Sequence, residues 1–249
     1  MQNNRRRKPD AAPEPVFRVY LLGLVDFDTV LSFQRRLVYD AWSDRAVATL
    51  ILCEHPALVS VGRQGSWAHI DRGIEQYRSG RLPVRWVNRG GGSILHTPGQ
   101  LAIYPILALD RHELSIQGYL DRFRVALLAL LGDFSIKGIV RPGHSGVCVG
   151  DRPIAEIGIA VRHWVTYFGA ALNVNPDLRL FRHVSSGVAG CRDMTSIERE
   201  RHGPLRPSLV REHLIEHVAR EFGFGQPLLF TDHPSLKLKV RCDALAPHR

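Results

Sequence analysis

The stretch from Gly146 to Val174, GVCVGDRPIAEIGIAVRHWVTYFGAALNV, is the part of the sequence that decides the fold. Three runs rich in apolar and β-branched residues follow one another here, at residues 146–149, 154–161 and 165–174, and such runs are typical of strands. Asp151-Arg152-Pro153 separates the first two and suits a hairpin turn, because proline favours a bend. Consecutive strands joined by short turns pair antiparallel, so the stretch predicts an antiparallel sheet.

The rest of the chain mixes strands and helices without strict alternation. Apolar residues at helical spacing and capping residues predict the helices, and residues 54–83 read as loop-rich. We expect further strands at residues 16–24, 47–53, 84–88, 101–109 and 136–140, and helices from Asp26 or Asp28 to Trp42, at 116–131, and at 208–222 with Ser208 as cap. This pattern predicts an α+β fold in a single domain with a largely antiparallel sheet.

The charge balance is strongly basic, with a formal net charge of +9. Four of these charges could be assigned to residues 5–8 alone. We expect residues 1–14 to form a disordered basic tail, and residues 15–249 to form the folded domain. A basic protein attracts acidic partners over distance. Because the sequence carries no helix-turn-helix, zinc-finger or RNA-recognition signature, an acidic protein explains the charge as well as nucleic acid does.

The sequence indicates reduced thiols and no membrane span. It contains no run of about 18 apolar residues, so we expect no membrane span, and its first residues lack the apolar stretch of a secretory signal. The four cysteines, Cys53, Cys148, Cys191 and Cys242, are far apart and form no CxxC pair. Reduced thiols in a reducing compartment are therefore expected.

A glycine-rich segment, RGGGSILHTPGQ at residues 89–100, follows the expected strand at 84–88. Successive glycines let a backbone approach a ligand closely and present N–H groups to it. Arg89 could hold a phosphate or a carbonyl, and His96 could face the same cavity. The segment matches neither of the common phosphate-binding glycine patterns, so its local chemistry alone also fits a flexible turn.

Four segments together, at residues 89–100, 146–158, 166–178 and 184–187, resemble the octanoyltransferase (lipoate-protein ligase B) family. That family typically reads R-G-G-x-x-T-Y-H-G-P-G-Q, P-G-V-[WY]-V-x-x-x-K-I-A-x-x-G, F-H-G-x-A-L-N-V-N-x-D-L and P-C-G, in this order. The resemblance spans roughly Leu22 to Ile197 and implies the single-domain fold shared by biotin and lipoate ligases.

The resemblance also implies an activity. The family moves an octanoyl group from acyl carrier protein to a lysine of a lipoyl carrier domain, in 2-oxoacid dehydrogenases or the glycine cleavage H protein, as a step of lipoate biosynthesis. Acyl carrier protein is acidic, which suits the basic charge of this chain. No cofactor, metal, nucleic acid or membrane is expected. ATP-dependent ligation is less attractive, because related ligases depend on a lysine that is absent here.

Carried over position by position, the resemblance implies an acyl-substrate pocket made by the glycine-rich segment and the two strands at 154–161 and 165–174. Its residues would be Arg89, Gly90, Gly91, Gly92, Ser93, Ile94, Leu95, His96, Glu156, Ile157, Gly158, Gly169, Ala170 and Ala171. Ile94 and Leu95 replace a threonine and a tyrosine of the family, and Phe168 replaces a typical histidine.

Two departures concern the reactive residues. In the family a cysteine accepts the acyl group as a thioester and a lysine lowers its pKa, whereas Ser186 and Pro153 stand at these two positions. A thiol titrates near ~8.5 and supplies some thiolate at neutral pH, but a serine needs a positioned base. Proline offers none, and the guanidinium of Arg152 stays protonated.

The catalytic roles could have moved to other residues. Cys191, five residues beyond Ser186, could act as the nucleophile, although a packing role suits it at least as well. Cys148 lies in an apolar run and is interpreted as a core residue. His96 is a candidate base, whereas His144 and His183 read as ordinary loop histidines.

One rival motif is His213-Leu-Ile-Glu216-His217, which matches the H-x-x-E-H pattern of inverted metalloproteases. Two histidines four residues apart share a helix face, but the pattern needs a third ligand that the following residues supply poorly. We therefore expect a solvated helix face here and not a metal site. The sequence leaves two functional hypotheses: an acyltransferase that uses Ser186 or Cys191 with His96, and a non-catalytic relative that binds an acyl group, lipoate or a lipoyl domain.

Overall fold

The computed structural model describes residues 16–70, 82–184 and 193–236. In chain order its elements are β1 (Val16–Leu24), α1 (Phe27–Ser43), β2 (Val47–Glu54), β3 (Leu58–Val61), η1 (Trp67–His69), β4 (Val84–Trp86), β5 (Ser93–His96), β6 (Gln100–Ile106), α3 (Ile116–Asp133), β7 (Val147–Val149), β8 (Arg152–Arg162), β9 (Val165–Asn173), η2 (Leu178–His183), α4 (Ile197–Arg201), α5 (Pro207–Phe222) and β10 (Leu228–Phe230). The basic tail predicted at residues 1–14 lies outside the described residues.

A seven-stranded sheet in the order β10-β1-β2-β6-β9-β8-β7 forms the centre of the molecule. β1 pairs in parallel with β10 and with β2. The pairs β2–β6, β6–β9, β9–β8 and β8–β7 are antiparallel. The predicted α+β fold with a largely antiparallel sheet is therefore confirmed.

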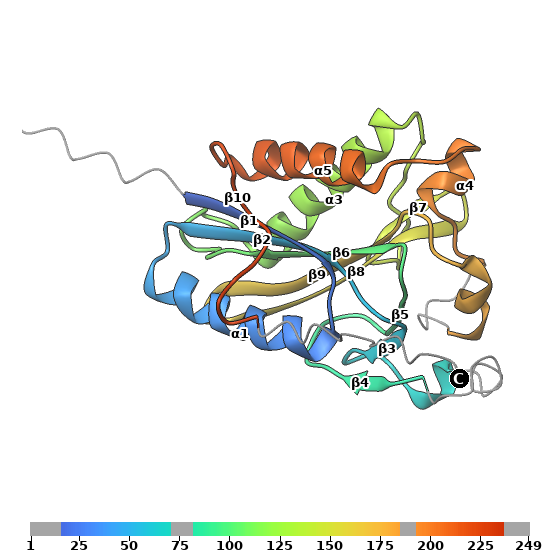
Figure 1. Ribbon diagram of the computed structural model, residues 1–249, viewed down its shortest axis with the longest axis horizontal. Helices are drawn as coiled ribbons and strands as arrows, with labels where there is room; N and C mark the ends of the chain where they lie inside the picture. The colour runs from blue at the N-terminus through green and yellow to red at the C-terminus, as the bar shows by residue number, and fades with distance from the viewer. Residues whose placement is uncertain (1–15, 71–81, 185–192, 237–249) are drawn as a thin grey trace, which may run out of the picture.

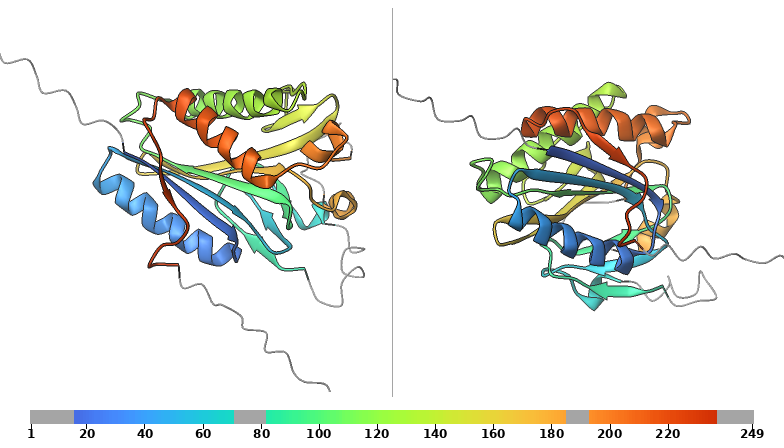
Figure 2. Two further views of the ribbon diagram at one scale, coloured as in Figure 1. Left: turned by 45° about the horizontal axis from the view of Figure 1, so that its top comes forward. Right: turned by 60° about the vertical axis from the view of Figure 1, so that its left-hand side comes forward.

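Helices cover both faces of this sheet, with α3 and α5 together on one face and α1 on the other (Figure 1). The views in Figure 2 show the sheet between these two layers. Phe123 of α3 and Leu214 of α5 pack with Ile157 of β8 in the larger core cluster. Phe33 of α1 packs with Tyr104 of β6 in a second cluster on the opposite face. Among the described helices, none is both long and apolar enough to cross a membrane.

A smaller sheet in the order β4-β3-β5 supports the glycine-rich turn. β3 pairs in parallel with β4 and antiparallel with β5, and the turn at residues 87–92 connects β4 to β5. Val59 and Val61 of β3 pack with Leu95 of β5 and Phe181 of η2. The turn is thus fixed at both of its ends by a packed sheet.

Several sequence predictions are confirmed at the level of individual elements. The strand predicted at residues 16–24 is β1, and α1 begins after Asp26, whose carboxylate accepts the Thr29 N–H at 3.0 Å and caps the helix. The helix predicted at residues 116–131 is α3, with Ser115 as its cap. The strands predicted at 154–161 and 165–174 form the β8–β9 hairpin.

Other local predictions are wrong. Residues 54–83, interpreted as loop, contain β3, and residues 136–140 form no strand but only a single bridge from Ile139 to Cys148. The first turn of α5 begins at Pro207 without a side-chain cap, so Ser208 is not the cap; proline is accepted there because its missing N–H would have no partner in the helix.

The hairpin turn between β7 and β8 is also shifted from its prediction. Gly150 adopts a left-handed backbone with φ of 61° and makes the turn with Asp151, whereas Arg152 and Pro153 already belong to β8. A register shift between Val147 and Cys148 accompanies the pairing of Cys148 with Pro153. Proline inside a strand is typical of such irregular pairing.

Candidate active site

The glycine-rich turn at residues 89–92 lies directly on the backbone of β8. The Gly90 N–H donates to the Ile159 carbonyl at 2.8 Å, and Gly91 adopts a left-handed backbone with φ of 78°. A Cβ atom added to Gly158 would lie 2.6 Å from the Gly90 carbonyl oxygen. Two backbones therefore meet here at a distance that only glycine permits.

We expect Gly158→Ala to lower the free energy of unfolding by about 1–3 kcal/mol, because the added methyl group forces the turn away from β8. Urea denaturation measures the change. Gly132→Ala in α3 is the matched control, since a Cβ there meets nothing within 4 Å, and it should raise stability by about 0.5–1 kcal/mol. Equal effects of the two substitutions would contradict the close approach.

Arg89 anchors the turn from beneath. Its side chain is buried, with Nη1 donating to the carbonyls of Gly90 and Gly92 at 2.9 and 3.0 Å, and Nη2 donating to the carbonyl and the hydroxyl of Ser60, both at 2.8 Å. Burial lowers the pKa of Arg89 to about 10, while Tyr104 and Glu156 oppose the shift. The guanidinium therefore stays charged at neutral pH and holds backbone carbonyls of the protein itself.

His96 lies beside this anchor and is neutral. Its Nε2 lies 2.9 Å from the Ser60 hydroxyl, and burial lowers the pKa of His96 well below its ordinary value, with His55 and Arg89 lowering it further. Arg89 can only donate to the Ser60 hydroxyl, and among the described contacts His96 Nε2 is the acceptor available to the hydroxyl proton, so we assign this bond as Ser60 donating to His96 Nε2. The ring proton of His96 is thus on Nδ1.

The Nδ1 atom of His96 is buried and has no hydrogen-bond partner among the described residues. A side-chain interaction with Gln100 opposes part of the pKa shift of His96. The Nε2 of Gln100 donates to the Leu95 carbonyl and to Asn173, so only its Oε1 could accept from Nδ1. An unpartnered donor in a buried site carries a desolvation cost that an acceptor on a ligand would remove.

His55 is a second neutral histidine and lies next to His96. Its Nδ1 donates to the Val25 carbonyl at 2.7 Å, and its Nε2 lies 2.9 Å from the Tyr104 hydroxyl. Burial lowers the pKa of His55 to about 4. Its ring stands edge to face with that of His96, so His55 fixes the position of its neighbour.

These side chains enclose a small inner pocket of about 10 Å³. That volume is about the size needed for one water molecule. The pocket is lined by Phe27, Ser60, Arg89, Ile94, His96, Tyr104, Gly158, Phe168, Gly169, Ala170 and Ala171. Its small residues lie on β8 and β9, and its polar groups come from β3, the glycine turn, β5 and β6.

The sequence matches the family model described as lipoyl protein ligase A/B catalytic domain over residues 26–220. The octanoyltransferase of Geotalea uraniireducens is 38% identical over 187 residues, which cover 74% of this chain and 83% of that protein. The octanoyltransferase of Roseiflexus sp. is 36% identical over 217 residues, which cover 86% and 90%. The chain belongs to the octanoyltransferase family.

Solved structures show the same fold at low sequence identity. A bi-partite lipoate protein ligase from Thermoplasma acidophilum superimposes with a TM-score of 0.64 at 16% identity, covering 88% of this chain and 89% of the other. A lipoate-protein ligase A structure bound with ATP gives a TM-score of 0.63 at 16% identity, with coverage of 88% and 90%. The predicted lipoate-ligase fold is confirmed.

The structure of this octanoyltransferase-family chain brings half of the predicted pocket residues to the lining of the inner pocket. Arg89, Ile94 and His96 meet the β8 and β9 positions Gly158, Gly169, Ala170 and Ala171 around the inner pocket. Gly90, Gly91 and Gly92 form the turn above it without lining it, and Ser93 is buried in β5 with an unpartnered hydroxyl. Whether these residues bind substrate stays a prediction.

Two predicted residues point elsewhere. Ile157 is buried in the core under α3 and α5, and Leu95 packs in the small-sheet cluster. Gly158 lines the pocket, whereas the side chain of its neighbour Ile157 packs on the other face of the sheet, in the cluster under α3 and α5. Phe27, Ser60, Tyr104 and His55 were missed, because they come from elements that the four motifs do not cover.

Glu156 lies in a separate buried cluster next to the pocket. Its Oε1 is 3.2 Å from His144 Nε2, and the Cys148 sulfur is 3.7 Å from His144 Nδ1. The Gly146 N–H also lies 3.1 Å from that Nδ1. Burial would lower the pKa of His144, but its contacts with Cys148 and Glu156 raise the pKa to about 10. Cys148 is buried as predicted, but His144 is also buried and connects Cys148 to Glu156.

Pro153, at the position of the family lysine, is buried in β8, and its carbonyl accepts the Thr195 N–H at 2.9 Å. The adjacent Arg152 pairs with Glu200 and offers no base. Ser186 and Cys191, the two candidate nucleophiles, lie outside the described residues. Their roles therefore stay predictions.

The H-x-x-E-H motif on α5 has a structural role in the described chain. His213 Nδ1 and His217 Nε2 both contact Asp133 Oδ2 of α3, at 2.7 and 2.6 Å, while Glu216 is exposed. Within residues 16–70, 82–184 and 193–236, no group of three His, Cys, Asp or Glu side chains is arranged to hold a metal ion. The expected solvated face is instead a contact between two helices, and His217 is buried.

We expect Asp133→Asn to lower stability by about 1 kcal/mol at pH 7, because the carboxylate accepts from two histidines. Burial by itself would raise the pKa of Asp133, but these hydrogen bonds outweigh it and lower the pKa. Because the pKa of Asp133 is lower in the folded than in the unfolded protein, its carboxylate stabilises the fold fully at pH values above its unfolded pKa, near ~3.8. This stabilisation is lost as the pH falls through the folded-state pKa.

Urea denaturation of the wild type and Asp133→Asn between pH 7 and pH 3.5 tests this, with Asp151→Asn in the exposed β7–β8 turn as control. The difference in the free energy of unfolding between the wild type and Asp133→Asn should become smaller as the pH falls toward 3.5. A difference that stays constant over this range would contradict the assigned carboxylate.

Proposed function

We propose that this protein transfers an octanoyl group from acyl carrier protein to a lysine of a lipoyl carrier domain, with altered catalytic residues. The observation that carries the proposal is the unpartnered Nδ1–H of His96 in a pocket walled by Gly158, Gly169 and Ala171. Family membership at 36–38% identity supports the activity.

In this proposal His96 is a hydrogen-bond donor and not a base. Its Nε2 already accepts from Ser60, and its lowered pKa keeps the ring neutral. A neutral Nδ1–H can donate to the carbonyl oxygen of a thioester and stabilise the negative charge that develops there. The inner pocket has room for such a carbonyl group, whereas an eight-carbon chain requires that rings such as Phe27 or Phe168 move.

The transfer would occur in two steps. The hydroxyl of Ser186 or the thiol of Cys191 attacks the thioester carbonyl, the carrier thiol leaves with the proton, and an acyl-enzyme forms. The lysine amine of the acceptor domain then attacks this acyl-enzyme, forms an amide and restores the hydroxyl or thiol. We also propose that the protein acts in the cytoplasm and that its basic surface attracts the acidic carrier protein.

The decisive test is the intact mass of the protein after incubation with octanoyl-acyl carrier protein. We expect an added octanoyl group that maps to Ser186 or Cys191 after digestion. An ester on Ser186 should resist neutral hydroxylamine, whereas a thioester on Cys191 should be cleaved. An adduct on Cys148 would assign the chemistry to the His144–Glu156 cluster instead.

The alternative proposal is a non-catalytic relative that binds an acyl group or a lipoyl domain. The specific observation that favours it is Pro153, because the strand position of the family lysine carries no titratable group. Binding of octanoyl-acyl carrier protein without any covalent adduct or transfer would support this alternative over the acyltransferase.

A further inference from the structure

A second, much larger cavity lies between α1 and the turn end of the β8–β9 hairpin. Its volume is about 560 Å³, against about 10 Å³ for the inner pocket. Cavities that hold small organic ligands range from roughly 300 to 1,000 Å³, so this outer cavity is large enough for such a ligand. Phe168 forms part of the wall of both cavities.

The outer cavity has an apolar floor and aromatic sides. Leu31 and Val38 of α1 form the floor together with Val87 and Phe168. Trp42 and Trp86 line it while remaining 44% and 55% exposed. Large aromatic side chains left exposed around a concave apolar surface are typical of a binding site.

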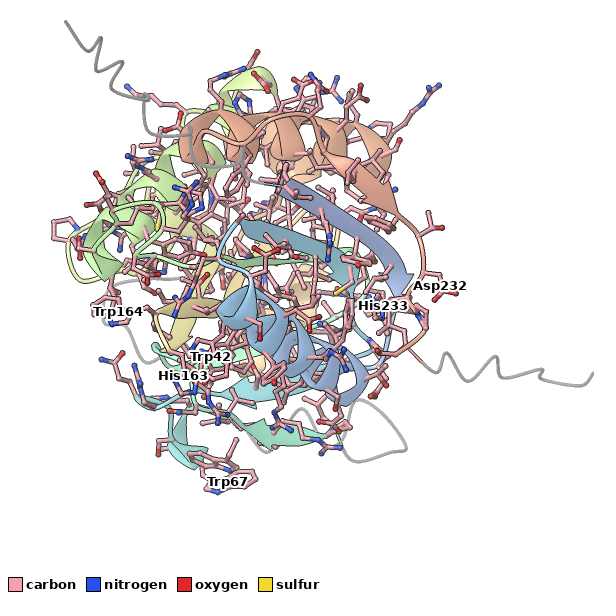
Figure 3. The ribbon with its side chains drawn as sticks, turned by 90° about the vertical axis from the view of Figure 1, so that its left-hand side faces the viewer. Trp42, Trp67, His163, Trp164, Asp232 and His233 are labelled. Carbon is pink, nitrogen blue, oxygen red and sulfur yellow. The ribbon has the colours of Figure 1, made fainter. Side chains whose placement is uncertain are left out.

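The charged groups that line this cavity are the guanidinium groups of Arg35 and Arg162. Arg35, Arg162 and His163 line it, and no carboxylate is among its described lining residues. The ring of His163 stacks on Trp42 at 5.1 Å, and Figure 3 shows these two side chains together where α1 meets the hairpin. The cavity therefore combines an apolar floor with a rim that attracts an anion.

The backbone around the cavity is strained. His163, Trp164 and Phe168 have φ values of 52°, 62° and 58°, a left-handed conformation that costs energy for residues other than glycine. The buried Gln34 of α1 accepts the Phe168 N–H at 2.7 Å and holds that conformation. Strain of this kind persists where surrounding contacts fix it and is frequent at ligand sites.

We propose that the outer cavity binds a medium-chain fatty carboxylate. The alkyl tail lies on the floor formed by Leu31, Val38 and Val87, and the carboxylate faces Arg35 and Arg162. Guanidinium groups bind carboxylates through paired N–H donors. A nucleic acid would be attracted by the same basic groups, but it fits this cavity less well, because the apolar side chains of the floor cannot bind its phosphates. This inference does not depend on the proposed function, since binding of a free carboxylate needs no nucleophile.

Isothermal titration calorimetry of the full chain with sodium hexanoate, octanoate and decanoate tests the proposal. Burial of each added methylene should tighten binding about fourfold. Leu31→Trp, which fills the floor, should weaken octanoate binding more than about tenfold. Leu209→Trp, at a partly exposed position on α5, is the matched control and should bind like the wild type.

The role of the basic rim is tested by Arg35→Gln and Arg162→Gln, two surface changes that leave the core intact. Together they should weaken octanoate binding several-fold and leave the weaker binding of 1-octanol unchanged. Absence of octanoate binding, affinity independent of chain length, or unchanged affinity in Leu31→Trp would each overturn the proposal. If octanoate binds as expected but the protein does not transfer octanoyl groups, this inference is supported and the proposed function is wrong. If the protein transfers octanoyl groups but octanoate does not bind in this way, the proposed function is supported and this inference is wrong.

Discussion

Arg89→Met is expected to lower the free energy of unfolding by about 3–5 kcal/mol, because it removes a buried cation that satisfies several acceptors. Methionine preserves much of the apolar stem but leaves the carbonyls of Gly90, Gly92 and Ser60 without the donors that they have in the wild type. The glycine turn would then lose its side-chain anchor to β3 and keep only the backbone hydrogen bonds between them. For a domain of this size the midpoint of thermal unfolding should fall by on the order of 10 °C.

Thermal unfolding followed by circular dichroism measures this effect, with Arg35→Met at an exposed position of α1 as control. The control should stay within about 0.5 kcal/mol of the wild type. The free energy of unfolding of Arg89→Lys should lie between those of Arg89→Met and the control, because an ammonium keeps the charge but cannot reproduce the planar set of N–H donors of a guanidinium. An Arg89→Met protein as stable as the control would show that the turn is held by other contacts.

The main sheet could be predicted from the sequence because its strands are apolar runs bounded by turn residues. The β8–β9 hairpin was found in this way. The glycines at 90–92 were interpreted as room for a ligand, whereas in the structure Gly90 lies against the backbone of β8 at Gly158. β3 was missed because Leu58–Val61 is only four residues long and lies in a stretch without a periodic pattern. Its partner β5 was hidden within the motif at residues 89–100.

The hydrogen bonds between the polar side chains of the site could not be predicted from the sequence. Ser60 is 36 residues from His96 along the chain, and only the pairing of β3 with β5 brings them together. His144 likewise meets Glu156 through the β7–β8 hairpin. The motifs indicated which positions gather in the pocket, but the direction of each hydrogen bond, and hence the donor role proposed for His96, required the structure.

The largest change in activity is expected from Ser186→Cys combined with Pro153→Lys. If the pocket around His96 is otherwise intact, the double variant should raise octanoyl transfer by on the order of a hundredfold or more, because a thiolate is a far better nucleophile than an unactivated hydroxyl. Pro153 is buried in β8, and burial lowers the pKa of a lysine. An ammonium at this position would stabilise a neighbouring thiolate.

The single substitutions separate the two contributions. Ser186→Cys alone should give less activity because its thiol lacks the ammonium, and Pro153→Lys alone should give little because serine still lacks an aligned base, so the effects should be non-additive. Transfer of octanoyl from acyl carrier protein to a lipoyl domain is measured by mass spectrometry after thermal unfolding has shown that each variant is folded. Thermal unfolding comes first, because the Pro153 carbonyl accepts from Thr195 within a tightly paired strand. A folded double variant that binds octanoyl-acyl carrier protein and forms no acyl-enzyme would show that the site differs from an active octanoyltransferase by more than these two residues.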